Sequence, residues 1–192
     1  MKVLSDVLEW GAGNKNKKGL YGSNMNWAKG KDKIHKLMEE GVKEMQKDNP
    51  NPKVFKNKEG PRMNAGFTKY YALACEDVII YDGRVAAALG LLTIKFLIEK
   101  GEEKVPPELD FGWTRPNSKN IRNPNKSKEN PNQQYKFQEI GYDKHHIHAE
   151  SNIRANWIIS QAMCKTKDKE WDSEKIDMRK IEAALFILGY SL

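Results

Sequence analysis

The chain has little cysteine and no long hydrophobic run. Only Cys75 and Cys164 occur among its 192 residues, so a four-cysteine iron–sulfur site is excluded. No run of about 18 apolar residues is present, and we expect no membrane-spanning helix. The polar segment from Met1 to Asp6 is not typical of a secretory signal. These absences favour a reduced, cytoplasmic protein.

Length and composition indicate one soluble domain. A chain of 192 residues is long enough to bury a core without disulfides or metals. Its 39% hydrophobic and 31% charged residues are ordinary for a globular protein, and no internal repeat is present. We therefore expect residues 1–192 to form a single compact domain.

Apolar periodicity predicts a mainly α fold. Helices are expected over residues 3–10, 32–47, 68–75, 83–100, 148–165 and 173–189. Residues 83–100 form the strongest of them, because the stretch from Val85 to Leu92 is apolar on nearly every side and therefore typical of a central, buried helix. In residues 148–165 we expect three side chains to face inward: Ile153, Trp157 and Ile158.

The remaining segments are predicted to be extended or irregular. Residues 11–30 and 110–140 are rich in glycine, asparagine, proline and lysine and lack apolar periodicity, so both are predicted as long loops. Residues 53–65 are expected to be a connector. The run Val78-Ile79-Ile80-Tyr81 favours extended backbone but is too short to found a sheet. A loop as long as 110–140 in a compact domain is usually functional.

Positive charge is concentrated in two of these segments. The chain carries a net charge of +7. Residues 14–33 hold six lysines and one aspartate, and residues 115–136 hold six basic residues and one glutamate, so each segment carries +5. The rest of the protein is therefore slightly acidic. Solvated loops would explain these runs, but basic loops rich in backbone and amide donors also suit phosphate contacts.

We interpret the two segments as a DNA-binding surface. Tryptophan side chains within or beside them, Trp27 and Trp113, and the phenol of Tyr135 would offer flat faces for stacking on bases. The predicted phosphate contacts are Lys15, Lys17, Lys18, Arg115, Lys119, Arg122, Lys126 and Lys128.

Between the two basic segments lies a pairing of a lysine with an aspartate. Residues Gly66 to Cys75 predict a turn and a short helix that begins near Lys69. The extended run 78–81 then leads to Asp82, which precedes the apolar helix 83–100. An aspartate here is well suited to cap that helix, and a single lysine is usually solvated. Their order and spacing, however, bear on function.

This arrangement resembles the catalytic core of the helix-hairpin-helix DNA glycosylases. In that family a Gly-x-[Thr/Arg]-Lys turn is followed by a hydrophobic-Asp-x-x-[Val/Ile] segment, matched here by Gly66-Phe67-Thr68-Lys69 and Tyr81-Asp82-Gly83-Arg84-Val85. The 8-oxoguanine glycosylase branch and its small bacterial relatives look closest. The resemblance covers residues 66–92, with a shorter separation of lysine and aspartate than in well-known members and no Leu-Pro-Gly hairpin upstream.

The resemblance implies two catalytic residues. Asp82 would stabilise the positive charge that develops on the sugar as the N-glycosidic bond breaks. Lys69, if desolvated, would attack the anomeric carbon as an amine and form a Schiff base that permits strand cleavage. The target base would leave the duplex stack to reach them.

A second cluster contains three of the four histidines, in Lys144-His145-His146-Ile147-His148. A metal site, a capping and packing role, and the wall of a polar pocket are three explanations of it. The cluster lacks a further ligand at a compelling spacing, so no metal or other cofactor is predicted. The predicted base pocket comprises Trp27, Trp113, His148, Asn152 and Arg154.

The leading prediction is a monomeric DNA glycosylase, with or without lyase activity, that binds duplex DNA and extrudes a modified base. An oxidised purine and a bulky phage base such as glucosylated cytosine are the candidate substrates, and the second would imply antiviral defence. Two alternatives stay open: a non-catalytic DNA-binding module, and a metal-dependent hydrolase using the residues from His145 to His148.

Overall fold

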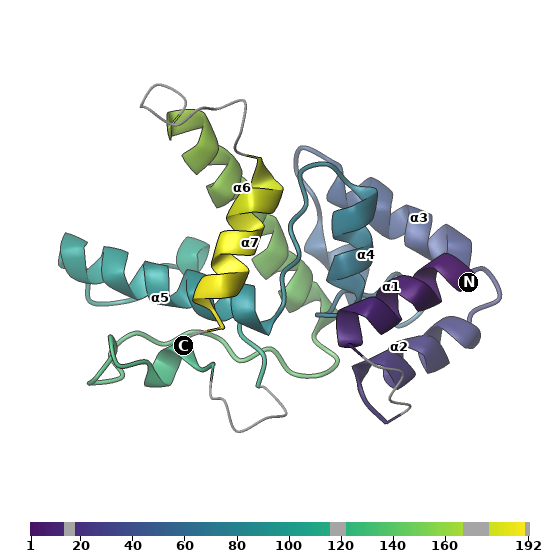
Figure 1. Cartoon of the computed structure of the whole chain (residues 1–192), viewed down its shortest axis with the longest axis horizontal. Coiled ribbons are helices and arrows are strands. Elements are labelled where there is room, and N and C mark those ends of the chain that lie inside the picture. Colours follow the sequence, from purple (N-terminus) through teal and green to yellow (C-terminus); the bar gives the residue numbers. More distant parts are fainter. Residues whose placement is uncertain (14–17, 116–121, 167–176, 191–192) are drawn as a thin grey trace.

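The computed structural model describes residues 1–13, 18–115, 122–166 and 177–190. In these ranges the protein is mainly helical, with seven α-helices, three short 3-10 helices and no β-strand (Figure 1). One isolated β-bridge joins Trp113 to Glu139. The mainly α prediction is confirmed, and the described chain folds as one compact unit.

The α-helices are α1 (Lys2–Ala12), α2 (Leu20–Lys29), α3 (Ile34–Met45), α4 (Phe67–Ala74), α5 (Gly83–Lys100), α6 (His145–Thr166) and α7 (Met178–Leu188). The 3-10 helices are η1 (Pro52–Lys56), η2 (Pro107–Leu109) and η3 (Pro124–Lys126). Helix α5 has the predicted bounds. The other predicted helices are present with shifted ends, except that the predicted start of the last one falls outside the described residues.

The prediction of a loop over residues 11–30 is wrong, because α2 forms within it. This helix lacks apolar periodicity, yet it buries Asn24, Met25, Trp27 and Ala28. Packing against the rest of the protein therefore overrides a poor local propensity. In contrast, the described part of residues 110–140 is largely irregular, as predicted.

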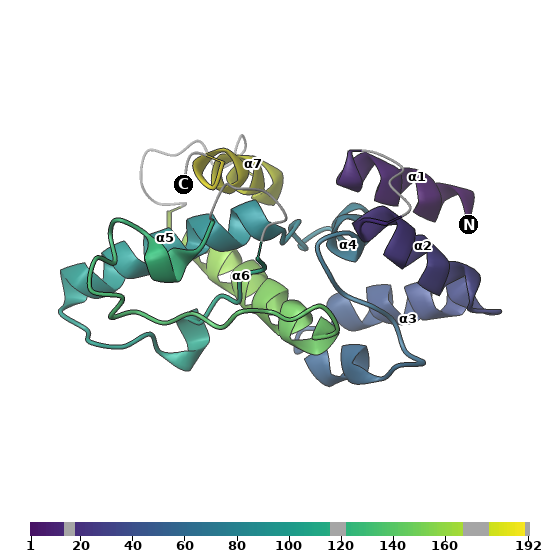
Figure 2. The same cartoon turned by 90° about the horizontal axis from the view of Figure 1, so that it is seen from below.

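Two hydrophobic cores lie side by side. The first is built by α1–α4 and η1, and the second by α5, α7 and the segment around residues 111–140. Helix α6 crosses both (Figures 1 and 2), contributing Ala149 and Ile153 to the first core and Ala155 and Ile159 to the second. This shared helix holds the two halves together.

The inward face of α6 differs from the predicted one. Trp157 is 46% exposed and Ile158 is 36% exposed, whereas Ile153 is buried as expected. Asn152 and Asn156, one helical turn apart, are buried in their place. Amides replace apolar side chains on this face because they hydrogen-bond to the segment that α6 covers.

That segment, residues 78–82, is called here the linker. It leaves α4 and passes from the first core to the second, ending where α5 begins (Figure 1). Val78 belongs to the first core, and Ile79 and Tyr81 belong to the second. The linker therefore places a residue of α4 next to the N-terminus of α5.

None of the helices in the described ranges is both long and apolar enough to cross a lipid bilayer.

Candidate active site

Lys69 lies in the first turn of α4, with its aliphatic stem against the last turn of α1. The contact is made at Gly11, where a Cβ atom would stand 2.1 Å from the lysine Cδ. A glycine is therefore required for this lysine conformation. The Lys69 Nζ donates a hydrogen bond to the Ala65 carbonyl oxygen at 2.7 Å.

Asp82 is the N-cap of α5. Its Oδ1 accepts hydrogen bonds from the backbone N–H groups of Arg84 at 2.9 Å and Val85 at 3.3 Å. These bonds satisfy donors that have no partner inside the helix, and they fix the orientation of the carboxylate. Only Oδ1 takes part in capping, which leaves Oδ2 available for another partner.

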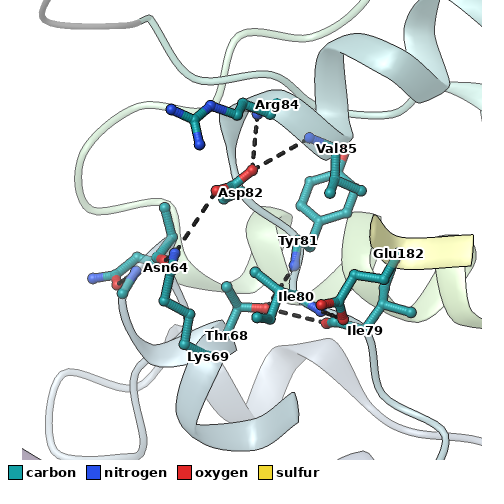
Figure 3. A network of polar contacts seen from close by, with 12 residues as sticks. Asn64, Thr68, Lys69, Ile79, Ile80, Tyr81, Asp82, Arg84, Val85 and Glu182 are labelled. Atoms are coloured by element: carbon teal, nitrogen blue, oxygen red, sulfur yellow. Dashed lines mark hydrogen bonds and ion pairs between the residues drawn. The ribbon is translucent and has the colours of Figure 1, made fainter. Parts of the chain in front are cut away.

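The second oxygen faces the lysine. The distance from Lys69 Nζ to Asp82 Oδ2 is 3.8 Å (Figure 3). The two side chains are only 10% and 15% exposed. A direct charge-assisted hydrogen bond would be about 2.7–2.9 Å long, so the amine and the carboxylate are close but are not directly hydrogen-bonded. The structure thus brings the two predicted catalytic residues into one site.

Burial lowers the pKa of the Lys69 ammonium below its ordinary value. Asp82 opposes this change, whereas the positive charge of Arg84 lowers the lysine pKa further. The net effect is a lowered lysine pKa, which increases the fraction of the free amine. The free amine is the form able to act as a nucleophile.

The linker is held by side chains of three helices. From α6, Asn156 accepts from the Ile79 N–H at 3.1 Å, Asn152 donates to the Ile79 carbonyl at 2.9 Å, and His148 Nε2 donates to the Tyr81 carbonyl at 2.8 Å. From α4, Thr68 Oγ1 accepts from the Tyr81 N–H at 2.9 Å. From α7, Glu182 accepts from the Ile80 N–H at 2.7 Å.

These bonds replace the partners that a neighbouring strand would supply. A buried backbone N–H or C=O without a partner costs about 1–3 kcal/mol, so an isolated extended segment needs side-chain partners. The same bonds fix the backbone immediately before Asp82. The position of the carboxylate therefore depends on α4, α6 and α7 together.

Arg84 stands beside the pair on α5. Its guanidinium lies 4.2 Å from the ring centroid of Phe186, in the last turn of α7, and 4.9 Å from that of Tyr190, which follows the helix. Cation–π contacts of this kind restrain an arginine. Arg84 therefore supplies a fixed positive charge near Lys69.

The aromatic residues predicted to stack on bases are buried. Trp27 packs edge to face on Phe67 in the first core, with Arg62 over its ring. Trp113 lies in the second core and donates from Nε1 to the Phe137 carbonyl, and Tyr135 is also buried there. Their rings fill the cores in this structure instead of facing solvent.

The other predicted pocket residues, on α6, support the protein framework. His148 and Asn152 are buried and bind the linker, as described above. Arg154 pairs with Glu150 at 2.6 Å and donates to the Asp110 carbonyl at 3.3 Å. All three side chains are hydrogen-bonded to the protein itself.

The histidines of this cluster have separate surroundings. His145 Nδ1 donates to the Met63 carbonyl at 2.7 Å, whereas His148 binds the linker. Burial lowers the pKa of His148 to about 4, so its ring is neutral at pH 7. Among the described residues, no group of three or more His, Cys, Asp or Glu side chains is arranged to hold a metal ion.

Those predicted phosphate contacts that the structure describes are distributed over both halves. Lys18, Lys126 and Lys128 are exposed, and Arg115 is exposed while pairing with Glu139 at 3.1 Å. Arg122 is half-buried. Lys15, Lys17 and Lys119 lie outside the described residues.

Sequence reasoning missed Thr68 and Glu182 as linker partners. Neither has a local sequence signal, because Thr68 accepts from linker backbone 13 residues away and Glu182 from linker backbone 102 residues away. Asn152 and Asn156 did have one: two amides on one face of a largely buried helix require partners.

A cleft of about 1090 Å³ lies elsewhere, between the end of α4 and helix α7. Neither Lys69 nor Asp82 lines it. The pair is the better candidate for chemistry, because it combines a buried amine with an adjacent carboxylate, whereas the cleft is mostly apolar.

Comparison with known proteins found no matching family model, no similar curated protein and no similar solved structure.

Proposed function

We propose that this protein is a DNA N-glycosylase whose active site is the Lys69–Asp82 pair. The observation that carries the proposal is a lysine amine with a burial-lowered pKa, 3.8 Å from a carboxylate oriented by a helix N-terminus. A carboxylate and an amine are the two groups that base excision through an imine requires.

In the proposed reaction, the C1′–N bond of an extruded nucleotide breaks and its electron pair leaves with the base. Asp82 stabilises the positive charge on the sugar. The Lys69 amine, as nucleophile, donates its lone pair to C1′ and gives one proton to the departing base. The C1′–O4′ bond then breaks, and the second amine proton passes to O4′, which leaves an imine between Lys69 and C1′. If water attacks instead, an abasic site is formed without lyase activity.

We also propose that α4, the linker and α5 form the core of a helix-hairpin-helix glycosylase. The order of α4, linker and α5, with the lysine on the first helix and the aspartate capping the second, supports a helix-hairpin-helix glycosylase core. Upstream of α4 the described chain has η1 and then irregular residues 57–66, in place of a second α-helix close before it. The proposed core is thus a shortened variant.

The placement of the basic segments supports DNA as the substrate. Helix α2, in the first segment, and η3, in the second, both lie along the lower edge of the molecule in Figure 1, on opposite halves. The N-terminus of α5 lies between them in that view. A duplex along this edge would pass the Lys69–Asp82 pair.

The first test is base release from duplexes carrying one modified base each. Separate duplexes contain 8-oxoguanine, glucosylated hydroxymethylcytosine or only normal bases, and abasic sites are measured by alkaline cleavage. We expect one modified duplex to be processed. Binding of all the duplexes without base release would instead identify a non-catalytic DNA-binding module.

The Asp82→Asn variant tests the catalytic carboxylate on the duplex that is processed. Asparagine retains capping capacity but removes the charge, so we expect base release to fall at least ~100-fold with little change in melting temperature. Asp177→Asn is the matched control, because Asp177 caps α7 through the Lys180 N–H and forms no ion pair with a lysine of the described ranges. If both variants release the base at the same rate as the parent, Asp82 acts only as a helix cap.

A further inference from the structure

The proposed reaction requires a flat apolar surface beside the pair, which none of the predicted stacking residues supplies. An extruded base loses its stacking in the duplex and regains it on aromatic side chains of the enzyme. Trp27, Trp113 and Tyr135 are buried in the two cores. The stacking surface therefore has to come from another residue.

Trp10 has the required position and exposure. It lies in the last turn of α1 and is 61% exposed. The next residue, Gly11, is the one that contacts the Lys69 stem, with a Cβ position 2.1 Å from the lysine Cδ. Figures 1 and 2 show this end of α1 next to α4, at the junction of the two cores.

The indole of Trp10 is not part of a core. Leu4 and Leu8 form the buried face of α1, and Trp10, two positions after Leu8, lies on the outward face of the helix. Its large apolar surface is therefore accessible to a ligand. Trp157 is the other exposed tryptophan of the described chain, but it lies on α6 opposite the face that binds the linker. Trp10 is thus the exposed indole that directly precedes the residue in contact with Lys69.

We propose that Trp10 is the side chain on which the extruded base stacks. The inference rests on the proposed glycosylase function and adds a base-binding residue to it. Stacking would hold the base near the end of α1 while its sugar faces Lys69 and Asp82. The contact between Gly11 and the Lys69 stem would hold the end of α1, which carries Trp10, at a fixed position relative to the amine.

The experiment uses two DNA duplexes that differ at one position, a bulged 2-aminopurine or a tetrahydrofuran that has no base. Binding is measured by anisotropy, and stacking by quenching of 2-aminopurine fluorescence. We expect W10L to bind the 2-aminopurine duplex about tenfold more weakly than the parent and to lose the quenching. Its affinity for the tetrahydrofuran duplex should stay close to the parent's.

Two further variants complete the design. W10F keeps an aromatic ring and should behave like the parent, which separates stacking from any effect on folding. W157L removes the other exposed indole and should also behave like the parent.

Parent-like binding and quenching by W10L, or an equal loss on both duplexes, would overturn the assignment of Trp10 and leave the glycosylase proposal standing. A parent protein that binds neither duplex and releases no base would overturn both.

Discussion

Lys69 and Asp82 each combine a structural contact with the chemistry proposed for them. The lysine is bonded to the Ala65 carbonyl and packed on Gly11, and the aspartate caps α5. Because one carboxylate oxygen serves the cap and the other faces the amine, the two roles do not compete. Substitutions can therefore separate them.

Lys69 should titrate below the ordinary lysine pKa, because burial disfavours its charged form. Reductive ¹³C-methylation followed by NMR titration measures this without any substrate. Arg84→Gln should raise the Lys69 pKa, since it removes a nearby positive charge that lowers it. A Lys69 resonance that titrates at the ordinary lysine pKa would contradict the role of burial.

His148 should make the protein sensitive to acid. Its pKa is about 4 in the folded protein and about 6.5 when unfolded, so the unfolded state binds more protons between these values. The free energy of unfolding should therefore fall as the pH drops from 6.5 to 4, by about 3 kcal/mol from this residue.

Urea denaturation at several pH values between 7 and 4 measures the effect of His148. His148→Gln keeps a donor for the Tyr81 carbonyl but does not titrate, so its stability should depend less on pH in this window. A variant with the same pH dependence as the parent would assign the acid sensitivity to other groups.

At the scale of elements, the extended linker depends on helices that are distant in sequence. Asn156 is 77 residues away from Ile79, to which it is hydrogen-bonded. Apolar periodicity located α5 with its correct bounds and α4 nearly so, because local pattern and burial agree there. The same method missed α2, which lacks apolar periodicity, and it misassigned the inward face of α6, where amide side chains are buried.

Asn156→Leu should destabilise the protein by about 1–3 kcal/mol, because it leaves the buried Ile79 N–H without its acceptor. Gln161→Leu is the matched control, since Gln161 is an exposed amide on the same helix. Chemical denaturation of both variants measures the difference. Equal stability of the two would mean that the linker finds another acceptor.

At the scale of the whole molecule, the two basic segments give the protein its net positive charge, and their described parts lie on opposite halves. A DNA-binding surface built this way would be sensitive to salt, because neutralised phosphates release condensed counterions. The salt dependence of DNA binding therefore depends more on where the positive charges lie than on the total net charge.

Replacing Lys126 and Lys128 with glutamine should therefore flatten the plot of log affinity for duplex DNA against log salt concentration, by about 1.8 in slope for two lost phosphate contacts. Lys36 and Lys43, exposed on α3, provide a control pair with the same change in net charge. Fluorescence anisotropy at several salt concentrations gives the slopes. A similar flattening by both pairs would show a general charge effect and no specific contact by the second segment.

The sequence by itself determined the helical class, the central helix α5, the extended run before Asp82, and Lys69 and Asp82 as the residues to examine. These features depend on local periodicity, capping and turn chemistry, which act over a few residues. Only the tertiary structure decided that the pair meets at 3.8 Å, that Trp27 and Trp113 are buried while Trp10 is exposed, and that α6 uses amides to hold the linker. Those outcomes depend on which surfaces pack together, and packing is a property of the whole chain.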